Sequence, residues 1–193
     1  YENIYLDSAV TYDSTNLLTV SNDFRLELLR NDSVENVLNQ ISVGVGHDYH
    51  RVSYDSSFTQ NIHNLSVLGD VNGRLFKKVD WMASSKMMFF GYNVWDLKVD
   101  GQFDYQILSS KFSAFINYSL FRPDFITDKY SSNNFAWDND WLQTQHLKTG
   151  LIYSQSKLRF KGSFTYHVLD NLVVFGEDRL PYQSKSVNQL MVI

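Results

Sequence analysis

Hydrophobic and polar residues alternate with a period of two along most of the chain, which is typical of β-strands with one apolar and one polar face. The alternation is clearest over residues 18–28, 95–106, 111–120 and 157–168, and weaker over 4–12, 37–49, 60–76, 79–90 and 142–154. A last segment, 186–193, predicts one more strand. The pattern therefore predicts an antiparallel sheet of roughly nine complete strands and a tenth partial one.

The lengths of the strands and of their connections favour a membrane protein. Most predicted strands have about 10–14 residues, whereas soluble strands average about 5–6 and strands that cross a bilayer need about 9–11. Tight turns are predicted at 108–110 and 154–156, and long loops at 122–141 and 169–185, which hold Pro123 and Pro181. If the tight turns mark one rim, both long loops lie on the other. Outer-membrane barrels have short turns on one side and long loops on the other.

Composition excludes several other classes. The chain has 4 Ala and 4 Glu against 17 Asp, 22 Ser and 16 Asn, which argues against a helical bundle. With 44% hydrophobic and 20% charged residues the chain is not disordered. It has no cysteine, and its net charge of −4 without a basic stripe argues against nucleic-acid binding. Since Tyr1 is not a start methionine, we interpret the chain as processed or as a piece of a longer protein.

Alternation alone leaves open which face is buried, because a soluble lipocalin-like barrel turns its apolar face inward and a membrane barrel turns it towards lipid. The polar face carries charges in mid-strand, such as Arg25 and Asp100, and tyrosines gather towards strand ends, as in interfacial girdles. Gly101 and Gly162 lie on the apolar face, where they would weaken a packed core. We therefore predict one domain, 1–193: an all-β, antiparallel up-and-down transmembrane β-barrel, and a segment of a larger barrel.

Two loop regions resemble a known family. The first is Arg122-Pro123-Asp124-Phe125 with the aromatic and Asn/Asp-rich run 131–141; the second is 169–178 with Leu180-Pro181-Tyr182-Gln183 and Val187-Asn188. Over 121–193 the chain resembles the "putative porins" of Bacteroidota outer membranes, although Leu172 and Val174 stand where the family is more aromatic. The resemblance implies a barrel larger than 193 residues, made with a cleaved signal sequence. Its loop motifs carry no known catalytic role.

Charged residues on the predicted polar face are the candidate pore lining. They form an acidic ladder with one lysine, a basic ladder at 157–161, and isolated charges on other strands: Asp23, Arg25, Glu27, Asp96, Lys98, Asp100, Asp104, Lys111, Lys157, Arg159 and Lys161. Opposed ladders would create a transverse field that orients solutes, and they would equally serve as cross-strand charge pairs. Phe115 and Phe121 on the same face predict a plug, a constriction or a partner contact.

Other candidate chemistry is weak. On a strand, His47 points away from Asp48 and His50, so the two imidazoles cannot share a metal ion. No nucleophile elbow or triad spacing is present, so we predict neither an enzyme nor a metal or cofactor. In the loop, Trp137, Asp138, Asp140 and Trp141 could bind calcium or sugar, and the simpler interpretation is a packed extracellular loop.

The sequence thus predicts a bacterial outer-membrane barrel that passes small polar solutes by passive diffusion. A structural barrel subunit of an outer-membrane complex for nutrient uptake, secretion or barrel insertion is the alternative, and a soluble ligand-binding barrel is a third. The expected partners are outer-membrane lipid and, in a complex, other outer-membrane proteins or lipoproteins.

Overall fold

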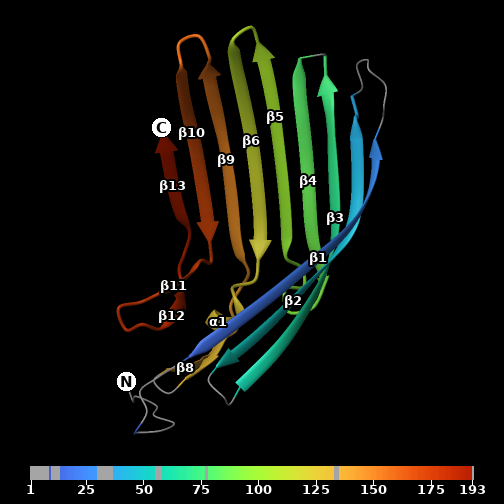
Figure 1. Cartoon of the computed structure of the whole chain (residues 1–193). Helices are drawn as coiled ribbons and strands as arrows, with labels where there is room; N and C mark the ends of the chain where they lie inside the picture. Colours follow the sequence, from blue (N-terminus) through green and yellow to red (C-terminus); the bar gives the residue numbers. More distant parts are fainter. Residues whose placement is uncertain are drawn as a thin grey trace.

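The computed structural model describes residues 9, 14–29, 37–54, 58–76, 78–132 and 135–192. Nine strands form one antiparallel sheet in the order β1-β2-β3-β4-β5-β6-β9-β10-β13 (Figure 1). Their bounds are β1 Thr15–Leu29, β2 Gln40–Tyr54, β3 Phe58–Leu75, β4 Val79–Phe90, β5 Leu97–Ile107, β6 Ser110–Phe121, β9 Thr144–Gln155, β10 Phe160–Asp170 and β13 Val187–Val192. The order along the sheet follows the order along the chain, as in a meander.

The predicted all-β, antiparallel class is confirmed, and most predicted strands are present. The strand predicted over 79–90 has those bounds, whereas the one predicted over 4–12 lies outside the described residues. Three predicted strand starts are wrong. The strand predicted over 37–49 is β2, which begins at Gln40. Trp95 (φ 71°) lies in the β4–β5 turn and Arg159 (φ 49°) in the β9–β10 turn, so β5 begins at Leu97 and β10 at Phe160. The alternation continues into these turns and conceals them.

The two ends of the sheet differ as predicted, although the tight turn predicted at 154–156 lies at 156–159, because β9 continues to Gln155. The β5–β6 and β9–β10 turns lie side by side at one end, joined by the N–H of Ser156 donating to the carbonyl of Ser109 at 2.9 Å (Figure 1). The longer connections lie at the opposite end and contain short elements of their own: α1 Phe125–Asp128, β7 Lys129–Ser131, β8 Ala136–Asp138, β11 Val173–Phe175 and β12 Pro181–Gln183. The predicted long loops are therefore two small hairpins, β7–β8 and β11–β12.

Burial separates the two faces of the sheet. Cross-strand partners share a face, so the register assigns each side chain to one side. Apart from Gly73, the buried residues of β2 and β3 lie on the polar face: Ser42, Gly46, Asp48, Val52, Tyr54, Ile62, Asn64, Ser66 and Leu68. On the apolar face Leu26, Val43 and Leu151 are 63%, 56% and 60% exposed. On β2 and β3 the polar face is thus the sheltered one, the reverse of a soluble lipocalin-like barrel, whereas β1 is exposed on both faces.

The sheet is open in the described part of the chain, with β1 and β13 as its edges. Closure into a barrel therefore remains a prediction. Among the described residues no helix is long and apolar enough to cross a membrane.

Candidate functional site

Ion pairs cover the polar face from β1 to β6. Six acid–base pairs lie on it: Arg25–Asp23 (3.6 Å), Arg25–Asp70 (2.5 Å), Arg74–Asp80 (2.5 Å), Lys86–Asp48 (3.1 Å), Lys98–Asp100 (3.4 Å) and Lys111–Asp104 (3.4 Å). Hydroxyl and amide groups complete the network. The amide of Asn117, for example, donates to Asp100 at 2.7 Å. Charged pairs that satisfy each other in this way keep the face polar without leaving isolated buried charges.

The charge on this face changes sign along the sheet. The polar face of β1–β5 carries seven acids and four bases, whereas that of β6, β9 and β10 carries Lys111, Lys148 and Lys161 and no acid. The segment 141–169 contains no Asp or Glu at all. One stretch of the polar face is therefore net negative and the other net positive, in addition to the local pairing.

Most of the predicted pore-lining residues lie on the polar face: Asp23, Arg25, Glu27, Lys98, Asp100, Asp104, Lys111 and Lys161. The predicted basic ladder is wrong in its geometry, because Lys157 and Arg159 belong to the 156–159 turn and only Lys161 is on the strand. Asp96 likewise precedes β5, where its carboxylate accepts from the N–H of Arg122 at 2.7 Å. That these residues line a pore remains a prediction.

Several polar-face charges escaped the sequence analysis: Asp48, Asp70, Arg74, Asp80, Lys86 and Lys148. Extending the alternation through β2–β4 would have found the first five, and extending it through β9 would have found Lys148. Phe115 lies where the prediction placed it, opposite Gly150, with the Lys148 ammonium 5.6 Å from its ring centre. Gly150 is required there, because a Cβ would lie 2.6 Å from that ring.

The connection between β6 and β9 is fixed by a buried ion pair. Asp128, 1% exposed, pairs with the Arg122 guanidinium at 3.1 Å and accepts from the Tyr92 hydroxyl at 2.5 Å. The Arg122 guanidinium also stacks on the Tyr92 ring, 4.5 Å from its centre. These contacts tie the β4–β5 turn to α1.

Burial shifts the ionisation of this cluster. Burial is the larger cause that raises the pKa of the Tyr92 hydroxyl, and the neighbouring Asp128 adds to it. Burial also raises the pKa of Asp96, against hydrogen bonds from Arg122, Asn93 and Gln143 that favour the carboxylate. Burial alone would lower the pKa of Arg122, but Tyr92 and Asp128 raise it overall. The guanidinium therefore stays charged and holds the loop.

The tryptophans of the loop serve its own packing. The indole N–H of Trp137 donates to the carbonyl of Ile126 at 3.0 Å, and that of Trp141 to the carbonyl of Thr127 at 2.9 Å. Asp138 pairs with Lys129 at 3.3 Å, and Asp140, which is 97% exposed, lies 3.5 Å from Arg122. These contacts match the simpler interpretation of a packed loop. Calcium or sugar binding by the four residues remains a prediction.

The loop lies against the polar face of the sheet. Tyr54, 2% exposed and on that face, donates to the carbonyl of Lys129 at 2.8 Å. Nearby, residues 124–126 and Tyr92 enclose a cavity of about 410 Å³ against the polar face of β1–β4. Asp48, His50 and Asn64 supply its polar wall. A solute that moved along the polar face would meet this cavity beside the loop.

Histidines occur in two stacked pairs. On the apolar face the Nε2 atom of His47 lies 3.1 Å from the Nδ1 atom of His63. On the polar face the Nε2 atom of His146 lies 3.0 Å from the Nδ1 atom of His167. His47 and His50 are on opposite faces, as predicted. Across the described ranges no group of three or more potential metal ligands is close enough to hold an ion.

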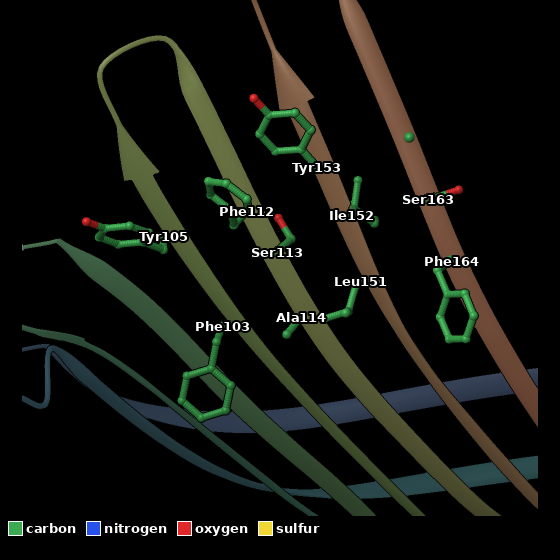
Figure 2. A pocket seen from close by; sticks show the side chains of 11 residues that line it. Phe103, Tyr105, Phe112, Ser113, Ala114, Leu151, Ile152, Tyr153, Ser163 and Phe164 are labelled. Carbon is green, nitrogen blue, oxygen red and sulfur yellow. The ribbon is translucent and has the colours of Figure 1, made fainter. Parts of the chain in front are cut away.

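The apolar face is hollowed between β5, β6, β9 and β10. Figure 2 shows aromatic rings standing around the small side chain of Ala114, from Phe103, Tyr105, Phe112, Tyr153 and Phe164. Gly162, the register partner of Tyr153, also lines the hollow. Phe112 and Tyr153 are in contact, with ring centres 4.7 Å apart. The hollow measures about 520 Å³ and its walls are almost entirely apolar.

Fold and site together define an all-β protein with a sheltered, charge-paired polar face, an exposed apolar face and an ordered loop against the polar side. The chain matches, over residues 1–193, the family described as "Putative porin", and it belongs to that family. This confirms the resemblance found in the loops and extends it to the whole chain. Comparison with curated proteins and with solved structures gave no match.

Proposed function

We propose that this chain forms part of the wall of an outer-membrane β-barrel. The polar face of the barrel lines a water-filled passage for the passive diffusion of small polar solutes. The observation that carries the proposal is the inverted burial of the sheet: paired charges lie on the sheltered face, and Leu26, Val43 and Leu151 on the exposed one. The charge-paired face suits contact with water, and the apolar face suits contact with lipid.

Strand length and backbone pairing support the membrane location. The eight strands β1–β6, β9 and β10 have 11 to 18 residues each, enough to cross a bilayer. In hydrocarbon an unpaired backbone N–H or C=O costs several kcal/mol, so the edges of β1 and β13 must both be paired there. A closed barrel supplies those partners, whatever its total number of strands.

The charge pattern indicates weak selectivity. Paired charges leave little net field, and the net negative and net positive stretches attract ions of opposite sign. Cations and anions should therefore both pass, and neutral polar solutes should pass with them. No catalytic group is needed for this transport.

Conductance of the full protein in planar bilayers tests the proposal. We expect discrete channels with a reversal potential near zero in a salt gradient. Replacing Lys111, Lys148 and Lys161 by Gln should make the channel cation-selective, because the net positive stretch is lost. Arg179→Gln with Lys185→Gln, which removes two positive charges at the opposite rim, is the control and should change nothing. A folded barrel that conducts no ions contradicts the proposal.

A second function, a structural barrel subunit of an outer-membrane complex, is favoured by the loop against the polar face. The ion pair between Arg122 and buried Asp128 holds α1 beside the cavity, where it narrows any passage. Under this alternative the barrel conducts nothing, and mild detergent extraction yields a stoichiometric outer-membrane protein or lipoprotein partner. A conducting protein that purifies alone contradicts it.

A further inference from the structure

A basic turn adjoins the aromatic hollow of the apolar face. The rings of Tyr105, Phe112 and Tyr153 in the hollow stand near the β5–β6 turn (Figure 2). Phe160, at the start of β10, has its ring centre 6.1 Å from that of Tyr153. The next residue of β10 on the apolar face after Phe160 is Gly162, which leaves room between the rings because it has no side chain. Immediately before Phe160 comes the turn 156–159, with Lys157 and Arg159, both exposed.

The side-chain charges of these two residues form no ion pair with the described part of the fold. Neither Lys157 nor Arg159 has an acid within ion-pair distance among the described residues, unlike Lys98 and Lys111 on the polar face. The nearest stretch of sequence offers none, since 141–169 lacks Asp and Glu. Lys161, on the polar side of the same rim, adds a third positive charge. Long basic side chains at a membrane interface extend their heads to the head-group level.

We propose that the hollow and the turn together bind one anionic glycerophospholipid, with its phosphate at Lys157 and Arg159 and an acyl chain between the aromatic rings. Arg159 and Gly162 are three residues apart, which is about 10 Å along a strand. The head group and the start of an acyl chain can therefore occupy both parts at once. The proposal rests on the proposed function, which turns this face towards lipid.

The choice of lipid follows from the rim and the charge. Short turns of outer-membrane barrels face the periplasm, so the leaflet at 156–159 consists of glycerophospholipids. Two or three cations without carboxylate partners favour a net negative head group over a zwitterionic one. The walls of the hollow are aromatic and aliphatic, which matches an acyl chain rather than a polar segment of a partner protein.

Lipid retention by the full, detergent-purified protein tests the site. Native mass spectrometry compares phosphatidylglycerol with phosphatidylcholine of the same acyl chains. We expect one phosphatidylglycerol bound at least tenfold more strongly, and Lys157→Gln with Arg159→Gln should remove that preference. Gly162→Leu, which fills the hollow, should weaken both lipids. Arg179→Gln with Lys185→Gln makes the same change in charge at the opposite rim and should leave binding unchanged.

Several outcomes would overturn the site. Equal retention of the two lipids, an equal effect of the control pair, or a second copy of the chain in place of lipid would each do so. Reconstitution of the same samples into vesicles separates this failure from that of the proposed function. A protein that inserts and conducts but shows no lipid preference overturns the site alone, whereas a protein that cannot insert overturns both.

Discussion

Removing the guanidinium of Arg122 should release the loop between β6 and β9 without unfolding the sheet. Arg122→Met keeps much of the side-chain length but leaves the carboxylate of Asp128, 1% exposed, without its cation. Breaking a fully buried pair costs about 3–5 kcal/mol. Because the Arg122 side chain is 32% exposed, water compensates part of the loss, and we expect about 2–3 kcal/mol.

Hydrogen exchange at the loop measures this cost directly. The N–H of Asn139 donates to the carbonyl of Asp128 at 2.7 Å, so its exchange reports opening. A cost of about 2–3 kcal/mol corresponds to exchange roughly 30- to 150-fold faster. The charge-neutral double variant Arg122→Met, Asp128→Asn should recover most of the protection, because it leaves no uncompensated charge.

Lys129→Met is the matched control, since it removes a cation from an exposed pair in the same loop. Such pairs contribute about 0–1 kcal/mol, so exchange should change less than about fivefold. If exchange in Arg122→Met is as slow as in this control, the ion pair does not hold the loop. The same conclusion follows if the double variant is no better protected than Arg122→Met.

Three further predictions concern the two faces and the turn. Ile116→Lys, on the apolar face of β6, should destabilise the inserted protein by about 2–4 kcal/mol, whereas Asn117→Lys, one residue along on the polar face, should be tolerated in urea unfolding from vesicles. Gly46→Ala should cost about 1–3 kcal/mol because its Cβ would lie 2.5 Å from a serine hydroxyl, whereas Gly69→Ala meets only an ordinary 3.5 Å contact and should be neutral in the same assay. The pKa of Tyr92 is raised in the folded protein, so this residue stabilises the fold at pH values below about 10, the pKa of an unfolded tyrosine, and the stabilisation is lost as the pH rises above 10. Phenolate absorbance should show that Tyr92 stays protonated above pH 10 until the loop opens.

The strands were predictable because each has one apolar and one polar face, and the local alternation of residue types records this. Ser110–Phe121 shows this well, since the clear alternation over 111–120 predicts its bounds to within one residue. The turns at Trp95 and Arg159 were not predictable in this way, because both adopt positive φ while the polar–apolar rhythm continues past them. Periodicity carries no information about a single residue that reverses the chain.

The site was predictable in its chemistry but not in its pairings. The sequence places Arg25 and Asp100 on a polar face, but that Arg25 pairs with Asp70, 45 residues away, follows only from the register of β1, β2 and β3. The ion pair of Arg122 and Asp128 depends on how a loop with little periodicity folds back on Tyr92. Such contacts arise from tertiary packing, which no local pattern encodes.

The most direct test of the central claim is cysteine labelling along β6 of the protein in lipid vesicles, since this chain has no cysteine of its own. Single cysteines at Ser113, Ala114, Ile116 and Asn117 sample both faces of one strand. A water-soluble maleimide should label positions 113 and 117 and spare 114 and 116, and spin-labelled acyl chains should quench probes only at 114 and 116. Labelling at 114 and 116 with protection at 113 and 117, or equal labelling at all four, would contradict an apolar face in lipid and a polar face in water.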